Sequence, residues 1–165
     1  MPEKETIERA HEDEREGKSP STQAGEFVRE EMHHIRGGKH GAQSTKQAIA
    51  IGLSKARRAG VKLNAPKQGK TSEETREKAG RNLSEGRSHS RKKPSARRSR
   101  AITKALKREG NSAASTRSLS KQASSSARKR GAASRSEAAL KAVRTKGKAG
   151  RSRASLKAAR TRAAA

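Results

Sequence analysis

Residues 26–63 read EFVREEMHHIRGGKHGAQSTKQAIAIGLSKARRAGVKL, and the strongest folding signals of the chain lie in them. It contains the only phenylalanine of the 165-residue chain and its densest group of larger aliphatic side chains. It also carries helix start and stop signals that agree with one another. We therefore expect the folded centre of the protein to lie here.

The first half of this stretch predicts an amphipathic helix. Ser19 and Pro20 are typical of a helix N-cap followed by the first helical position. Apolar side chains then recur at the 3.6-residue spacing of one helix face, at Ala24, Phe27, Val28, Met32 and Ile35. Gly37 and Gly38 follow and predict the end of the helix.

The second half predicts another helix. Ser44 to Gln47 has the pattern of a capping box, in which the serine accepts from the glutamine amide and the glutamine side chain reaches back. A narrow stripe of Ile49, Gly52, Leu53 and Ala56 follows, and Gly60 supplies a left-handed cap. Glycine is unfavourable inside a helix, so Gly52 predicts the close approach of a second helix.

Two such helices joined by GGKHGAQ predict an antiparallel helical hairpin. Its predicted core is Phe27, Val28, Met32, Ile35, Ile49, Gly52 and Leu53. The connection is longer than the roughly 3–4-residue turn of a DNA-reading helix-turn-helix, which argues against that motif. The apolar surface is small for the number of residues ordered, so we expect the hairpin to need a partner, a second copy in a homodimer, or its flanking segments.

Charge increases steeply along the chain. The whole sequence has 42 Lys and Arg against 16 Asp and Glu, a net charge of +26, with 28% hydrophobic residues. Residues 1–80 have 16 basic and 13 acidic side chains (net +3), whereas residues 81–165 have 26 and 3 (net +23). Such asymmetry indicates a polyanionic partner. Low hydrophobicity with high charge predicts a tail that is disordered when free and becomes helical on a polyanion.

The fold class we predict is mostly α, a small hairpin followed by a long basic tail that is disordered or forms isolated helical segments. The expected divisions are an acidic, frayed N-terminal arm (1–18), the hairpin (19–63), a linker with one short helix (64–94) and a repetitive tail rich in Ser, Ala, Lys and Arg (95–165). Within the tail, RSEAALKAVRTKG from Arg135 aligns with RSRASLKAARTRA from Arg151, an offset of 16 residues. We interpret this repeat as low complexity because it has no sizeable apolar face.

The tail is the predicted nucleic-acid-binding element, since its cations can neutralise phosphates and release counterions. The predicted contact residues are Arg91, Lys92, Lys93, Arg97, Arg98, Arg100, Lys104, Lys107, Arg108, Arg128, Lys129, Arg130, Lys141, Arg144, Lys146, Arg151, Arg153, Lys157, Arg160 and Arg162. Aromatic residues make up 1% of the chain, so stacking on single-stranded bases is not available, which favours sequence-independent binding of duplex DNA over RNA. A solubilising extension and a ligand for anionic membrane surfaces are weaker readings, the latter because the tail lacks apolar wedges.

The loop between the helices is a second candidate, as an anion-binding site at a helix N-terminus. Its predicted residues are Gly37, Gly38, Lys39, Gly41, Ser44 and Thr45. The loop lacks the order of a Walker A motif, and no strand precedes it. A flexible connector is the interpretation we favour.

Other chemistry is not indicated. His33, His34 and His40 lie near one another, but no ligand spacing is convincing, so we expect solvated histidines and no metal. We expect no enzyme, no cofactor and no small-molecule substrate, because no catalytic pattern is present. The chain has no cysteine, no signal-peptide pattern and no apolar run that could span a bilayer, which predicts a cytoplasmic protein with no membrane partner.

The stretch GKHGAQSTKQAIAIGLSKARRAGV, with the segment before it, resembles the shared block of a family of short, basic bacterial proteins of unknown function, some of them labelled plasmid stabilisation proteins. The resemblance implies a bacterial source and a tie to DNA maintenance. The basic tail leads us to expect a place in the nucleoid. The tail is similar in composition alone to linker-histone-like bacterial proteins. Two alternatives stay open: a protein-interaction module, such as an adaptor or antitoxin of a plasmid-maintenance system, and a ribosome- or RNA-associated basic protein.

Overall fold

The computed structural model describes residues 2–88 and 95–163; the side chains of residues 145, 146, 148–151, 154, 157 and 158 lie outside that description. Every regular element in the described ranges is a helix, which confirms the mostly-α prediction. The elements are α1 (Lys4–Arg15), α2 (Pro20–Arg36), α3 (Thr45–Arg58), α4 (Glu73–Arg87), α5 (Ala96–Arg108), the 3-10 turn η1 (Ser112–Ala114), α6 (Thr116–Lys129) and α7 (Gly131–Ala163). They form two compact units, Met1–Ser120 and Lys121–Ala165.

Helices α2 and α3 are the two predicted helices, and their ends follow the sequence signals. Pro20 occupies the first turn of α2, and Gly38 beyond its end has φ 72°. The Ser44 hydroxyl accepts a 3.2 Å hydrogen bond from the Gln47 amide, while the Gln47 side chain accepts from the Gln43 amide at 2.7 Å. The capping box is therefore present, with the glutamine reaching one residue further back than expected.

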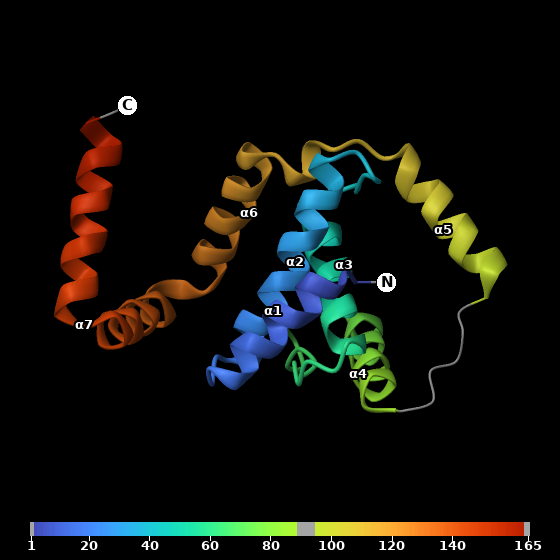
Figure 1. Ribbon diagram of the computed structural model, residues 1–165, viewed down its shortest axis with the longest axis horizontal. Coiled ribbons are helices and arrows are strands. Elements are labelled where there is room, and N and C mark those ends of the chain that lie inside the picture. Colours follow the sequence, from blue (N-terminus) through green and yellow to red (C-terminus); the bar gives the residue numbers. More distant parts are fainter. Residues whose placement is uncertain (1, 89–94, 164–165) are drawn as a thin grey trace. The chain divides into compact units, whose positions relative to one another are not determined.

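Gly52 brings the two helices into close contact, as predicted. A Cβ at this position would lie 2.7 Å from Val28 Cα and 3.0 Å from Val28 Cγ2. Real Cβ atoms do not tolerate such a distance from backbone, so the missing side chain lets α3 pack directly on α2. Figure 1 shows the two helices side by side.

The N-terminal helix completes one end of the core. Ala10 of α1 is buried with Ala24, Phe27, Ala56 and Val61, and Ile7, Leu53, Ala59 and Leu63 pack around this group. Helix α1 is thus docked on α2, whereas the sequence predicted a frayed, solvated helix or a disordered arm. Helix α1 has only two apolar side chains to bury, Ile7 and Ala10. Its docking therefore depends on the apolar surface that α2 and α3 form.

The segment of the basic tail that follows α5 completes the other end of the core. Met32, Ile35, Ala42 and Ala48 are buried together with Ala113 and Ala114, and Leu119 packs against them. The flanking segments therefore supply the burial that the hairpin lacks by itself. This is one of the three solutions expected from the sequence.

The tail is helical in the described residues, and the predicted disorder is not what the structure shows. Helix α7 contains a non-helical residue at Gly147, with φ 60° and ψ −176°. Gly147 is the last residue of the first aligned repeat, which begins at Arg135, and the second repeat begins after it at Arg151. The 16-residue repeat thus corresponds to two helical segments, which are exposed wherever their side chains are described.

Helix α4 packs on α3 at the far end from the loop. Gly86 permits this contact, because a Cβ there would lie 2.0 Å from the Arg57 carbonyl oxygen. Arg57 is buried, and its guanidinium donates to the carbonyl oxygens of Leu63 (3.0 Å) and Asn64 (3.3 Å).

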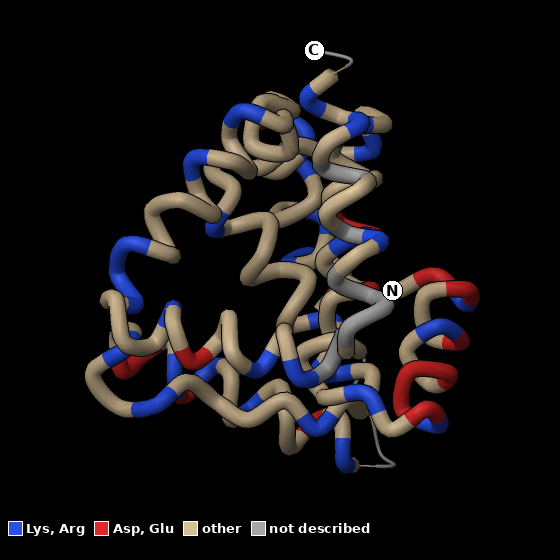
Figure 2. The backbone as a smooth tube through the Cα atoms, turned by 90° about the vertical axis from the view of Figure 1, so that its left-hand side faces the viewer, with Lys and Arg blue, Asp and Glu red and all other residues tan. Residues whose placement is uncertain are grey.

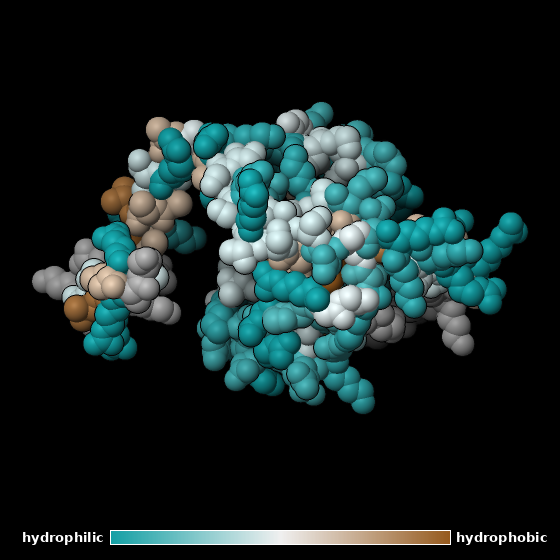
Figure 3. Space-filling model, turned by 90° about the horizontal axis from the view of Figure 1, so that it is seen from above, coloured by the Kyte–Doolittle hydropathy of each residue, from teal (hydrophilic) through white to brown (hydrophobic). Residues whose placement is uncertain are grey.

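In the described residues, none of the helices has the length and apolar character needed to cross a membrane. The surface in Figure 3 is mostly hydrophilic, with small separate apolar spots.

Candidate functional site

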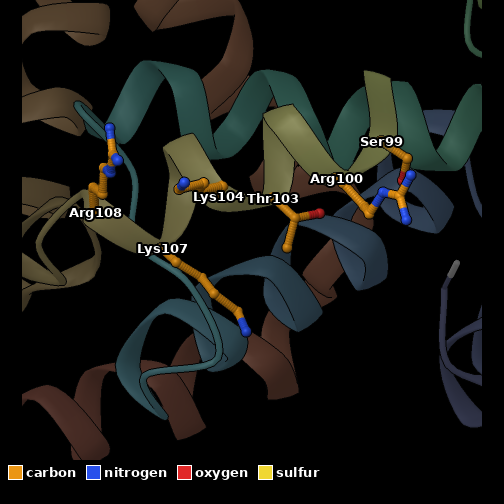
Figure 4. Close-up of a pocket in the computed structure, with 6 residues that line it drawn as sticks. All are labelled: Ser99, Arg100, Thr103, Lys104, Lys107 and Arg108. Carbon is orange, nitrogen blue, oxygen red and sulfur yellow. The ribbon is translucent and has the colours of Figure 1, made fainter. Parts of the chain in front are cut away.

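Helix α5 presents a row of cations on one face. Arg97, Arg100, Lys104 and Lys107 follow one another at spacings of three and four residues, which places them on the same side of a helix. All four are exposed. A groove of about 410 Å³ runs along this face and is lined by Ser99, Arg100, Thr103, Lys104, Lys107 and Arg108 (Figure 4). From Arg97 to Lys107 the row extends about 15 Å along the helix axis.

These cations have no carboxylate partners of their own. Within the described chain, no side chain of α5 or α6 takes part in an ion pair, whereas the ion pairs of the first unit join residues between Glu3 and Arg81. Only three acidic residues, Glu85, Glu109 and Glu137, occur after residue 80. In Figure 2, acidic residues gather in a few stretches while Lys and Arg recur along the trace. The positive charge of α5 is therefore open to an external anion.

The C-terminal end of α5 is fastened to the hairpin loop. The Gly41 amide donates to the Leu106 carbonyl oxygen at 2.9 Å, and the Ala42 amide donates to the Gly110 carbonyl oxygen at 3.2 Å. Just beyond, the Thr45 hydroxyl donates to the Ala113 carbonyl oxygen at 2.7 Å. A Cβ on Gly41 would lie 1.9 Å from the Glu109 carbonyl oxygen. The loop therefore holds the C-terminal end of α5 and the residues that follow it in place.

This contact changes the interpretation of the GGKHGAQS loop. Its backbone amides at 41 and 42 are used by the chain itself, and the Lys39 ammonium lies 2.8 Å from Glu3 Oε1. The Ser44 hydroxyl is used by the Gln47 amide. The structure therefore gives Lys39, Gly41, Ser44 and Thr45 contacts within the chain, and Gly37 and Gly38 follow the end of α2. The anion site stays a prediction.

The structure distributes the predicted phosphate-binding residues over three helices. Helix α5 carries Arg97, Arg98, Arg100, Lys104, Lys107 and Arg108; Arg128 and Lys129 end α6, and Arg130 follows; α7 carries Lys141, Arg144, Arg153, Arg160 and Arg162. All of these are exposed. Arg91, Lys92 and Lys93 lie outside the described residues, as do the side chains of Lys146, Arg151 and Lys157. The prediction missed Arg117, Lys121 and Arg135, which are equally exposed and which the overall charge of the tail already signals.

A second polar site is a cluster of charged side chains between α1, α2, the loop and α3. Glu30 and Glu31 of α2 are buried, and Lys55 of α3 reaches both: its Nζ lies 3.3 Å from Glu30 Oε1 and 2.6 Å from Glu31 Oε2. His40 Nε2 lies 3.3 Å from Glu31 Oε1. We call this group, with His34 and Glu3, the carboxylate–histidine cluster.

Glu3 connects this cluster to the start of α1. Its Oε1 lies 2.8 Å from Lys39 Nζ and 2.9 Å from His34 Nε2, and its amide donates to Glu30 Oε2 at 3.1 Å. The hydrogen bond from Lys39, followed by that from His34, lowers the pKa of Glu3 to about 2. Glu3 is therefore ionised at neutral pH and fixes the orientation of the His34 ring.

The three histidines differ in their surroundings. His33 is exposed, as expected, whereas the side chains of His34 and His40 are 13% and 16% exposed and lie edge to face, with ring centroids 6.1 Å apart. The prediction of solvated histidines is wrong for these two. The i,i+4 spacing of Glu30 and His34 was a usable signal, but the approach of Lys55 and His40 depends on the tertiary fold.

Comparison with known proteins gives one match. A family of unknown function, DUF6496, matches residues 15–68, which is 54 of the 165 residues and covers α2, the loop and α3. No curated protein and no solved structure matches the chain. The similarity thus falls on the hairpin and its loop, and its description gives no activity.

Proposed function

We propose that the protein binds nucleic acid without sequence preference, favouring duplex DNA, through the exposed cations of α5, α6 and α7. The observation that supports this most is the cationic row of α5, which has no carboxylate partners in the described residues and is fixed to a folded unit. A row about 15 Å long matches a length of duplex that carries about nine phosphate charges, counted over both strands. Its attachment to the hairpin loop reduces the ordering cost of binding.

The side chains available suit the phosphate backbone better than the bases. The single aromatic side chain of the sequence, Phe27, is 1% exposed and cannot stack on a base. Contacts from Lys and Arg to phosphates position a protein on nucleic acid but carry no sequence information. Binding should therefore depend on charge and on salt, and little on sequence.

Helix α7 supports the same function by a different arrangement. Its two halves, on either side of Gly147, carry Lys141 and Arg144 in the first and Arg153 and Arg160 in the second. A kink between two cationic segments lets each follow a different stretch of phosphate backbone. The cellular setting that this proposal implies is the bacterial nucleoid or a maintained plasmid.

The test is a binding titration of the full chain with labelled duplexes. Three duplexes of equal length and unrelated sequence should bind with affinities that agree within a few-fold. If 6–10 phosphates are contacted, affinity should fall about 10³- to 10⁵-fold between 50 and 200 mM salt. Marked preference for one duplex, or affinity that does not change with salt, would contradict the proposal.

Competition separates DNA binding from the RNA alternative. Unlabelled duplex RNA of the same length should displace the labelled DNA less well than unlabelled duplex DNA does. If RNA competes better, the ribosome- or RNA-associated role is favoured. A single stoichiometric protein partner, together with weak binding of both nucleic acids, would instead favour the adaptor role.

A further inference from the structure

We propose that Glu31, His34 and His40 form a binding site for a divalent transition-metal ion of the Zn²⁺ type. One ligand atom from each of these three residues lies within 4.8 Å of the other two. Two residues come from α2 and one from the loop that holds the C-terminal end of α5. The site is independent of the cations that we assign to nucleic acid.

The hydrogen bonding of His40 points its free lone pair toward Glu31. His40 Nδ1 lies 3.1 Å from the Gly41 carbonyl oxygen, which can only accept, so Nδ1 carries the proton. In the neutral ring, Nε2 is then an acceptor, and it lies 3.3 Å from Glu31 Oε1, a second acceptor. Two acceptors at this distance repel unless a cation or a proton lies between them.

A metal ion satisfies this geometry better than a proton does. A protonated Nε2 would donate to Glu31, yet Glu31 Oε1 receives no hydrogen bond in the described residues despite the 3.3 Å separation. Two atoms bound to a tetrahedral zinc ion at about 2.0–2.1 Å lie about 3.4 Å apart. The observed separation of Nε2 and Oε1 matches one edge of such a tetrahedron.

Glu31 gives an independent reason to expect a cation. Its side chain is fully buried, and neither carboxylate oxygen receives a well-aligned hydrogen bond in the described chain. Its two charged contacts are Lys55 Nζ, 2.6 Å from Oε2, and His40 Nε2, 3.3 Å from Oε1. Oε1 thus stays available on the side that faces the histidines. A buried carboxylate oxygen without a donor is costly, and metal ligation removes that cost.

The charges of the cluster permit a dication in spite of Lys55. Glu3, Glu30 and Glu31 contribute three negative charges, and Lys39 and Lys55 contribute two positive ones. With neutral histidines the cluster carries one net negative charge, which a divalent ion changes to one positive. Lys55 can keep its contacts with Glu30 Oε1 and Glu31 Oε2 while Oε1 of Glu31 binds the metal.

The surroundings of both histidines resemble those of metal ligands. The Glu3 carboxylate holds His34 Nε2 at 2.9 Å, and a backbone carbonyl holds His40 Nδ1. Ligating histidines typically donate their second ring N–H to a carboxylate or a backbone carbonyl, which fixes tautomer and ring orientation. Each ring is therefore left with one nitrogen lone pair for a ligand.

The donor set indicates the class of ion. Two imidazoles and one carboxylate suit Zn²⁺ and neighbouring transition metals, whereas Mg²⁺ and Ca²⁺ prefer oxygen ligands alone. Three protein ligands leave at least one position for water. Binding would connect α2 to the loop that carries Gly41, so the ion would fasten the region to which α5 is attached.

The experiment uses the full-length chain, freed of nucleic acid, titrated with Zn²⁺ by calorimetry and with Co²⁺ by visible absorption. We expect one ion per chain and the intense visible bands of four-coordinate Co²⁺. His34→Ala and His40→Ala should each weaken Zn²⁺ binding by more than about tenfold, the lower end of the effect of losing even a supporting contact. The matched control is His33→Ala, on the same helix but exposed, which should bind like the parent.

A second readout requires no substitution and therefore no assumption about variant folding. In the unaltered protein, Zn²⁺ should shift the ring nitrogen resonances of His34 and His40 and leave those of His11 and His33 in place.

The Lys55→Met variant should bind Zn²⁺ more tightly than the parent, because a competing cation is removed. Uniform shifts of all these histidines, loss of binding in His33→Ala equal to that in the ligand variants, or no stoichiometric ion would each overturn the site.

Discussion

Gly41 and Glu109 are in backbone contact across 68 positions of sequence: a Cβ on Gly41 would lie 1.9 Å from the Glu109 carbonyl oxygen. The Gly41 amide donates to Leu106, one turn of chain before Glu109, at 2.9 Å. This contact connects the family-like hairpin to the basic tail. The hairpin loop and α5 are therefore parts of one folded unit.

Gly41→Ala should separate the C-terminal end of α5 from the loop. The added methyl group overlaps backbone that cannot rotate away, and overpacking of this kind costs about 1–3 kcal/mol. The free energy of unfolding, measured by urea denaturation with helix content as the probe, should fall by that amount. The matched control is Gly25→Ala in α2, where nothing lies within 4 Å of the new Cβ, so the gain in helix propensity should stabilise by up to about 1 kcal/mol. Equal effects of the two substitutions would show that Gly41 is not in the contact.

Gly52→Ala should destabilise the protein although alanine favours helix. The new Cβ would lie 2.7 Å from Val28 Cα, which forces α3 away from α2. We expect a loss of about 1–3 kcal/mol in the free energy of unfolding. Gly80→Ala in α4, with open space around its Cβ, is the control and should be neutral or stabilising. A stabilised Gly52→Ala protein would contradict the packing of these helices.

Phe27→Ala should be the most damaging apolar truncation. Phe27 is 1% exposed and lies at the centre of the group that joins α1, α2 and α3. Truncation of a buried phenylalanine costs about 3–5 kcal/mol. Leu140→Ala, at a side chain that is 60% exposed, should change the free energy of unfolding by less than about 0.5 kcal/mol. Thermal unfolding of both variants checks the difference, and a small loss for Phe27→Ala would remove this residue from the core.

The hairpin could be predicted from sequence because its signals are local. Ser44 and Gln47 lie within one helical turn. A glycine inside a helix, such as Gly52, indicates a close helix contact, and a glycine after a helix, such as Gly60, indicates a left-handed cap. The docking of α1 could not be predicted, because Ile7 and Ala10 are weak signals without the surface that receives them. The packing of the tail against the hairpin could not be predicted either. Ala113 and Ala114 are small, and they lie in a segment whose composition is typical of disorder.

The candidate sites divide in the same way. The cations of the tail could be recognised one by one, because charge needs no partner in the fold to be identified. The carboxylate–histidine cluster could be recognised only in part: Glu31 and His34 are one turn apart, but His40 and Lys55 join them through the loop and α3. The attachment of the loop to the tail could not be predicted either, because the amides of Gly41 and Ala42 donate to residues more than 60 positions later.

We propose above that α5 contacts phosphates. The salt dependence of duplex DNA affinity in a triple variant, Arg100→Gln, Lys104→Gln and Lys107→Gln, tests it most directly. The matched control neutralises three exposed lysines elsewhere in the same unit, Lys46, Lys67 and Lys70. Each phosphate contact contributes about 0.9 to the slope of log affinity against log salt, so the α5 variant should lose about 2.7 of that slope. The control should lose much less. An α5 variant whose slope equals that of the parent protein, or of the control, would show that α5 does not contact the phosphates.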